Sequence, residues 1–338
     1  MDCTELLDKR LLIVSGKGGV GKSVVASTLA WIAAKRGKRT LLVEMDTVAS
    51  VSKMFGKAPG QHYREAELLQ NLSCFHVEGK SGLEEYLHLV LKSGMFVRRI
   101  VRSPIYQYFV NVAPGLKELM AVGKLWDLEQ KRLPGTDEPR YDLVVVDTPA
   151  TGHVLSYFQM PMTAAETAKG FVRREAQKVA DLFQDPVRTA FNIVTTLAEM
   201  PVNEALELYD NARSSLRLPI GRLFVNQVVP PFFDGPDEKS YRKWQNGLDQ
   251  TAKGGSSLQK GWTQRERAVL ACAESWKRAR GVQEGYLERL LKVCACETTL
   301  LPFVATTEAS LDMIQTLAGS IENPDESMKG RESADLGS

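Results

Sequence analysis

Residues 14–23 read VSGKGGVGKS, a glycine-rich run with two lysines and a serine at fixed spacing. Residues 16–23 fill the pattern G-x-x-x-x-G-K-[ST] at every fixed position. In such a loop, backbone N–H groups turn inward on a polyphosphate at a helix N-terminus that favours negative charge. Lys22 then supplies a cation for the phosphates, and Ser23 a hydroxyl ligand for Mg²⁺. The pattern predicts a nucleotide-binding loop made of Gly16, Lys17, Gly18, Gly19, Val20, Gly21, Lys22 and Ser23.

The elements around this run predict the fold. Residues 11–14 form an apolar run just before the loop, and residues 24–35 have the composition of a helix that Gly37 ends. Further short apolar runs lie at residues 40–44, 71–77, 143–146, 191–197, 223–226 and 298–304. Short apolar strands that alternate with helices are typical of an α/β fold with a doubly wound, mostly parallel sheet.

An acidic residue, Asp147, ends the run at residues 143–146. On a strand parallel to the one that precedes the loop, a carboxylate at this place holds magnesium together with the loop serine. The sequence therefore predicts a Mg²⁺ site made by Ser23 and Asp147.

Three strings carry a resemblance to a known family. The loop has the form K-G-G-x-G-K-[ST], with the additional Lys17; residues 147–153 read DTPATGH; and residues 223–231 read LFVNQVVPP. Together they resemble the arsenite-pump ATPases and the ATPase of the Guided Entry of Tail-anchored proteins pathway, within the deviant phosphate-loop ATPases. The resemblance covers roughly residues 11–320, and its details are closest to bacterial single-domain members.

The resemblance implies a cytoplasmic, Mg²⁺-dependent ATPase that works as a homodimer with ATP at the interface. Lys17 would reach across to the partner's nucleotide, in the role that an arginine finger plays elsewhere. Lys17, Lys22 and Asp46 are the implied catalytic residues, with Asp46 orienting the attacking water. The implied second switch comprises Asp147, Thr148, Pro149, Ala150, Thr151, Gly152 and His153. In the family this histidine belongs to the switch rather than to the chemistry.

The first switch departs from the family pattern. The family's D-P-A-H-[SN]-L is here Asp46 followed by TVASV, so its proline and histidine are missing. The departure puts the motion of this switch in question, and Glu44 is the alternative carboxylate for orienting the water.

Three further contacts with nucleotide are implied. Asn226 would hydrogen-bond the adenine edge, which an amide does with its donor and acceptor together. Pro302 begins a segment near the adenine, and Glu199 corresponds to a glutamate that contacts nucleotide across the dimer. For each, a structural role at a strand end or in a loop is the alternative.

The expected organisation places a helical subdomain beside the nucleotide core. The core comprises residues 1–80, 141–160 with the second switch, and 191–320 with a polar excursion at 230–261; the helical part comprises 81–140 and 161–190, and a disordered tail follows at 321–338. In the targeting ATPases such a helical part forms an apolar groove for a transmembrane helix. The corresponding apolar residues are Met95, Phe96, Met120, Leu155, Phe158, Met160 and Met162, for which core packing is the alternative.

Composition limits the other functions. The net charge of +2, with both signs spread along the chain, argues against a nucleic-acid partner and against the DNA-binding partition ATPases. No apolar stretch reaches the length of a membrane span, and five cysteines fit a reducing cytoplasm. Cys294 and Cys296 form a C-x-C without the spacing of a zinc or iron–sulfur site, so neither is expected. The leading function is the capture of a hydrophobic client or a membrane partner. The first alternative is the driving of an arsenite or other anion pump, and the second is a spatial-organisation ATPase of the partition or division-site type.

Overall fold

The computed structural model describes residues 3–45, 51–58, 64–77, 115–230, 264–306 and 308–323. Within them, one eight-stranded sheet has the order β3-β4-β2-β5-β1-β6-β7-β8, and only β3 and β4 pair antiparallel. The strands are β1 (Leu11–Gly16), β2 (Thr40–Met45), β3 (Ala66–Leu69), β4 (Leu72–Val77), β5 (Leu143–Asp147), β6 (Thr189–Thr196), β7 (Ile220–Val228) and β8 (Glu297–Pro302). The predicted α/β fold with a mostly parallel sheet is confirmed.

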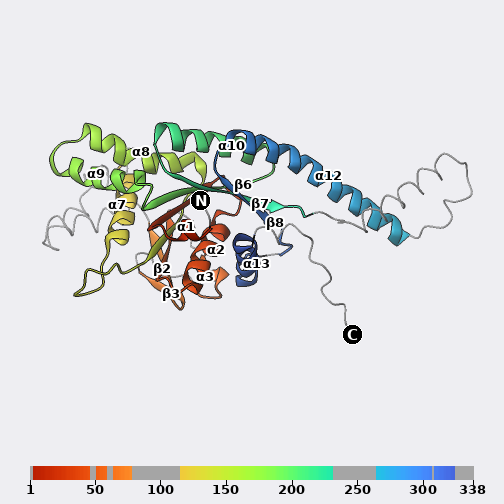
Figure 1. Ribbon diagram of the computed structural model, residues 1–338, viewed down its shortest axis with the longest axis horizontal. Helices are drawn as coiled ribbons and strands as arrows, with labels where there is room; N and C mark the ends of the chain where they lie inside the picture. The colour runs from red at the N-terminus through yellow and green to blue at the C-terminus, as the bar shows by residue number, and fades with distance from the viewer. Residues whose placement is uncertain are drawn as a thin grey trace, which may run out of the picture.

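Helices cover both faces of the sheet (Figure 1). One layer contains α1 (Cys3–Leu7), α2 (Lys22–Lys35), α3 (Val51–Met54) and α13 (Leu311–Glu322). The other contains α7 (Leu116–Gln130), α8 (Thr151–Thr167), α9 (Gly170–Gln184), α10 (Glu199–Asp210) and α12 (Gln264–Val293), and a π-helical turn at Asn211–Ser215 continues α10. In Figure 1, α12 extends well past the edge of the sheet.

The central strands are buried on both sides. Leu11 and Ile13 belong to the core under α7, α8 and α9, whereas Leu12 and Val14 belong to the core under α2. A strand with helices on both faces needs apolar side chains at successive positions, because neither face meets water. This is why residues 11–14 and 143–146 are recognisable as strands from sequence.

Several elements differ from the sequence prediction. Helix α2 begins at Lys22, inside the predicted loop. The helical part predicted at 161–190 contains the end of α8 and the whole of α9, which separate near Gly170, a residue with φ +64°. The edge strand β3 and the long helix α12 were not predicted. Residues 231–261 of the predicted excursion and 324–338 of the predicted tail lie outside the described residues.

Aromatic contacts attach the helical layer to the sheet. The ring of Phe158 on α8 lies 5.1 Å from that of Phe183 on α9 and 5.6 Å from that of Phe191 on β6, both edge to face. All three side chains are fully buried. Helices α8 and α9 therefore share one hydrophobic core with β6.

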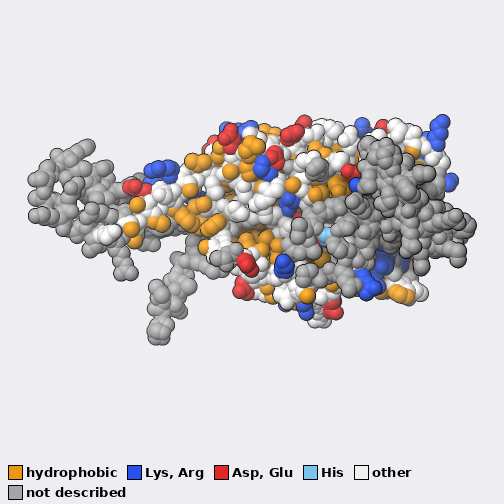
Figure 2. All heavy atoms as spheres, turned by 180° about the vertical axis from the view of Figure 1, so that it is seen from behind, with side chains coloured by type: hydrophobic (Ala, Val, Ile, Leu, Met, Phe, Trp, Pro, Cys, Tyr) orange, Lys and Arg blue, Asp and Glu red, His pale blue; other side chains and the backbone are white. Residues whose placement is uncertain are grey.

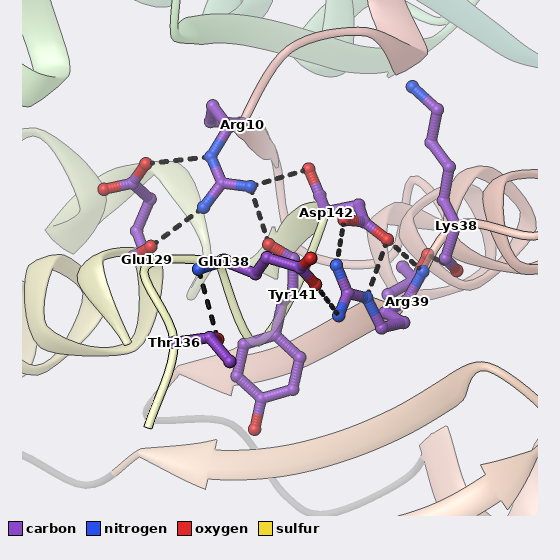
Figure 3. Close-up of polar contacts among 9 residues, drawn as sticks. Arg10, Lys38, Arg39, Glu129, Thr136, Glu138, Tyr141 and Asp142 are labelled. Atoms are coloured by element: carbon purple, nitrogen blue, oxygen red, sulfur yellow. Dashed lines mark hydrogen bonds and ion pairs between the residues drawn. The ribbon is translucent and has the colours of Figure 1, made fainter. Parts of the chain in front are cut away.

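Charged residues attach the layer at the amino ends of the strands. Glu129, near the end of α7, is buried, and its carboxylate pairs with Arg10 at 3.2 Å and with Arg188 at 2.5 Å. Figure 3 shows Arg10 between Glu129 and the backbone carbonyls of Tyr141 and Asp142. These contacts lie just before β1, β5 and β6 begin, so α7 is fixed to the sheet at the end away from the loop.

The space-filling view shows both kinds of charge on the surface (Figure 2). Hydrophobic side chains lie between them in the region where α12 runs. Among the residues of α12, Val269 and Val282 are exposed. Among the described residues, no helix is long and apolar enough to cross a bilayer.

Candidate nucleotide-binding site

The loop at residues 16–21 joins β1 to α2 in the middle of the sheet. Strand β1 lies between β5 and β6, and all three run parallel, so their carboxyl ends meet at one edge. Ligands of open α/β sheets bind at this edge. The fold therefore places the predicted loop where a nucleotide site is expected.

Two glycines of the loop are required by close neighbours. A Cβ on Gly16 would lie 2.1 Å from the carbonyl oxygen of Val194 on β6. A Cβ on Gly21, which has φ +93°, would lie 2.3 Å from Nδ2 of Asn226 on β7. Both distances are shorter than any side chain tolerates, so each position needs glycine. The loop is thus shaped by β6 and β7 as well as by its own sequence.

Lys22 opens α2, and its side chain turns back over the loop. Its ammonium donates a hydrogen bond to the backbone carbonyl of Lys17 at 3.1 Å. Burial lowers the pKa of Lys22, and the nearby Asp147 carboxylate partly opposes this shift. The cation therefore lies over the concave backbone that the sequence pattern assigns to phosphate.

Ser23 and Asp147 meet as predicted from sequence. The Ser23 hydroxyl donates to Oδ2 of Asp147 at 2.5 Å. Asp147 is fully buried, and among the described residues no group hydrogen-bonds to its other oxygen, Oδ1. Burial raises the pKa of Asp147 to about 6, although the Ser23 hydrogen bond and Lys22 act in the opposite direction. A buried carboxylate with an unused oxygen beside a hydroxyl fits a hard cation such as Mg²⁺.

Asn226 contacts the loop itself. Its Nδ2 donates to the carbonyl of Val20 at 2.9 Å, and its Oδ1 accepts from the backbone N–H of Gln227 at 2.9 Å. The side chain is buried at the end of β7. The family resemblance implies that this side chain hydrogen-bonds adenine, but the contact with the loop was not predicted from sequence.

The segment after Asp147 continues directly into a helix. The Thr148 hydroxyl donates to the carbonyl of Val14 at 3.0 Å, and α8 begins at Thr151. A Cβ on Gly18 would lie 3.7 Å from Cβ of Ala150, which is van der Waals contact. Of the predicted second switch, residues 148–150 form the connection, and residues 151–153 form the first turn of α8. A change in the loop can therefore reach α8 through one short connection.

The sequence profile of the anion-transporting ATPases matches residues 9–178, half of the chain. The chain belongs to this family. Residues of the chain are 31% identical over 234 positions to the ATPase BagA of Mycobacterium tuberculosis, which is 68% of each protein. They are 24% identical over 268 residues to the ATPase GET3 of Kluyveromyces lactis, covering 68% of this chain and 74% of the relative.

A third relative is a putative arsenical pump-driving ATPase of Halobacterium salinarum. It is 28% identical over 243 residues, covering 66% of this chain and 36% of the relative. The resemblance stated from the sequence motifs is confirmed, and the chain is an ATP-hydrolysing enzyme.

In this ATPase, Lys17 has a partner that the sequence did not predict. Its ammonium forms an ion pair with the carboxylate of Glu204 on α10, and each side chain is 28% exposed. Residues 17 and 204 are far apart in sequence, and no motif includes Glu204. Only the packing of α10 next to β1 and β6 brings the two together.

Of the two carboxylates considered for orienting the water, the structure describes only Glu44. Asp46 lies outside the described residues, with residues 47–50. Glu44 is buried; its Oε1 accepts from the backbone N–H of Val51 at 3.0 Å, and its Oε2 accepts from the Cys74 thiol at 3.5 Å. Glu44 thus joins β2 to the start of α3 and to β4.

The two remaining sequence candidates lie close to the carboxyl ends of strands β6 and β8. Glu199 is exposed in the first turn of α10, and Pro302 ends β8 opposite Val228. Their implied contacts with nucleotide stay predictions.

None of the five cysteines of this ATPase forms a disulfide, and Cys3, Cys74 and Cys294 are buried. Burial raises the pKa of Cys294 to about 12, and it raises the pKa of Cys296 as well. Across the described part of the chain, no three His, Cys, Asp or Glu side chains are grouped as metal ligands.

Proposed function

We propose that this ATPase is a homodimer whose ATP-bound form captures a hydrophobic helical client and releases it after hydrolysis. The observation that carries the proposal is the placement of two lysines in one loop. Lys22 covers the loop backbone, whereas the ammonium of Lys17 lies at α10, on the surface. A cation that points away from its own loop is suited to a nucleotide held by a second subunit.

In the proposed mechanism, each subunit binds nucleotide with the loop and the residues that surround it. Loop N–H groups and Lys22 would bind the phosphates, and Ser23 and Asp147 would hold Mg²⁺, which would supply positive charge next to the phosphates. Asp46 orients the attacking water, and Lys17 of each subunit stabilises charge at the other subunit's nucleotide. Asn226 holds the loop in place and presents its amide near the adenine.

The connection after β5 links hydrolysis to the helical layer. Ala150 lies close to Gly18, and α8 starts one residue later. Helix α8 packs against α7 and α9, so loss of the γ-phosphate shifts the helices that carry the apolar residues.

One residue of the proposed groove is corrected. Phe158 is fully buried between Phe183 and Phe191, so it is part of the core and cannot contact a client. Met120, Leu155, Met160 and Met162 are partly exposed, whereas Met95 and Phe96 lie outside the described residues. The partly exposed side chains support a client surface on α7 and α8.

A pump-driving role is the second candidate, and the name of the Halobacterium relative favours it. Arsenite binds soft thiolates, usually more than one. Burial raises the pKa of Cys74 and of Cys294, which keeps both as thiols at neutral pH. Cys74 and Cys294 are therefore poorly suited to bind arsenite as thiolates. Stimulation of the ATPase by arsenite, lost when cysteines are replaced, would favour the pump-driving role.

The location we propose is the cytoplasm, which five cysteines without a disulfide support. The net charge of +2, with both signs spread along the chain, supports a function without nucleic acid.

The test combines the molecular mass measured by light scattering with photo-crosslinking of a helical peptide. Light scattering should show that MgATP doubles the mass of the wild-type protein, and that Lys22→Ala stays monomeric. A photo-activatable apolar helix peptide should then label the α7 and α8 region only with ATP. Doubling of the mass without labelling would keep the dimer and reject the client.

A further inference from the structure

The side chain and the backbone of Lys17 are both held within one subunit. Glu204 on α10 binds its ammonium, and Lys22 donates a hydrogen bond to its carbonyl at 3.1 Å. The ion pair with Glu204 uses the same ammonium group of Lys17 that, in the proposed dimer mechanism, acts on the nucleotide of the other subunit. The hydrogen bond from Lys22 involves the cation that the phosphates of ATP attract.

We propose that Glu204 is a positioning residue that keeps Lys17 in its own subunit, and that ATP-driven pairing exchanges this ion pair for the nucleotide of a second copy of the chain. The inference rests on the proposed homodimer and adds a residue that sets how readily it forms.

Exposure makes the ion pair exchangeable. Each side chain is 28% exposed, so water screens the attraction and the pair is held only weakly. A triphosphate with Mg²⁺ offers more negative oxygens than one carboxylate does. The exchange therefore favours the nucleotide once a second subunit brings it within reach.

Nucleotide binding also weakens the hydrogen bond from Lys22 to the backbone carbonyl of Lys17. The ammonium of Lys22 that donates to the Lys17 carbonyl is the group that binds phosphate oxygens, which compete for its protons. When Lys22 turns to the phosphates, the backbone at Lys17 loses this contact. ATP in one site thus frees the residue that acts in the other.

The surface around Glu204 suits a second copy. Met200 lies one turn earlier on α10 and is 58% exposed, and Asn203 and Glu207 are exposed on the same side of the helix. An apolar side chain beside an ion pair gains from burial when another subunit covers it.

The experiment compares Glu204→Gln with Glu207→Gln, which removes the same charge one turn further along α10. First, the rate at which an amine-acylating reagent modifies Lys17 is measured by peptide mass spectrometry without nucleotide. Glu204→Gln should raise that rate by about two- to fivefold, the effect of losing an exposed ion pair, and Glu207→Gln should leave it unchanged.

Second, light scattering measures the protein concentration at which half of the chain is dimeric in MgATP. Glu204→Gln should lower this concentration by about two- to fivefold, and Glu204→Asp should restore part of the wild-type value. If the wild-type protein dimerises and Glu204→Gln behaves like Glu207→Gln in either measurement, the role of Glu204 is rejected. If the wild-type protein never dimerises with MgATP, the proposed homodimer itself fails.

Discussion

The Ser23 hydroxyl donates a 2.5 Å hydrogen bond to Oδ2 of Asp147, which joins the first turn of α2 to the last residue of β5. The two residues are 124 positions apart in the chain. Their contact brings the magnesium ligands predicted from two separate motifs to one point at the carboxyl edge of the sheet.

Replacing Lys22 or Asp147, two charged residues at this edge of the sheet, should abolish ATP hydrolysis. Lys22→Ala and Asp147→Asn are each expected to lower Mg²⁺-dependent ATP hydrolysis by at least about 100-fold, because they remove charge stabilisation that acts in the transition state. Burial raises the pKa of Asp147 to about 6, so a neutral amide should not destabilise the fold. Phosphate release and thermal melting measure the two effects. Unchanged turnover in both variants would reject the site.

Removing the cation of Lys17 should separate hydrolysis from binding. Lys17→Ala is expected to lower the turnover number by about 100-fold or more, in line with the loss of a charge supplied across an interface. Binding of a fluorescent ATP analogue by the monomer should change little, because Lys22 and the loop N–H groups remain. An active Lys17→Ala variant would remove the trans-lysine mechanism.

Asn226 allows its two roles to be told apart. Asn226→Asp retains an acceptor for the N–H of Gln227 and loses the donor to the carbonyl of Val20. Loss of this hydrogen bond, worth about 1 kcal/mol, together with a negative charge beside the phosphate-binding loop should weaken binding by at least about fivefold. If the residue only positions the loop, ATP and GTP are weakened equally. If it reads adenine, the preference for ATP over GTP falls, and competition titrations with both nucleotides distinguish the two outcomes.

Much of this arrangement was predictable from sequence, and the reasons are physical. The strands β1 and β5 are buried on both faces, so their residues form uninterrupted apolar runs. The loop is constrained by phosphate chemistry, so its residues have fixed spacing. Asp147 follows a recognisable strand, which placed it at the correct edge.

Contacts between distant, unpatterned residues were not predictable. Glu204 lies on an amphipathic helix among other acids, and nothing local marks it as the partner of Lys17. The contact of Asn226 with Val20 depends on how β7 lies beside the loop. In helix α12, apolar side chains such as Val269, Val282 and Leu291 are exposed, so the apolar residues do not lie on one buried face and give no clear helical period.

Glu129 should contribute to stability rather than to catalysis. Glu129→Ala leaves Arg10 and Arg188 without the carboxylate that joins them, and we expect a loss of about 1–3 kcal/mol in the free energy of unfolding. The KM for ATP should stay the same, because this pair of contacts lies at the opposite edge of the sheet. Urea unfolding with parallel kinetics measures both. Glu118→Ala, on the first turn of the same helix, is the matched control.

Asp142 gives a pH-dependent prediction. Hydrogen bonds from Arg39 hold the pKa of Asp142 below its ordinary value of 3.8. A lowered pKa in the folded state means that the contribution is present above about pH 4 and is lost as the pH falls through the folded-state pKa. Asp142→Asn should therefore destabilise the protein at pH 7 by about 0.5–1 kcal/mol, a value reduced for solvent screening. At pH 3 the two proteins should differ less; an equal difference at both values would contradict this account.

The contact between Gly16 and the carbonyl of Val194 has a consequence for transplanting the loop. The first glycine is shaped by a backbone atom of the neighbouring strand, and the last by a side chain on the strand after that. The eight residues GKGGVGKS therefore do not set the conformation of the loop by themselves, because β6 and β7 supply contacts that this conformation requires. If the same eight residues were grafted after an edge strand of another sheet, they would lack the contacts with neighbouring strands on one side. Their backbone would then be free to adopt conformations that do not bind phosphate.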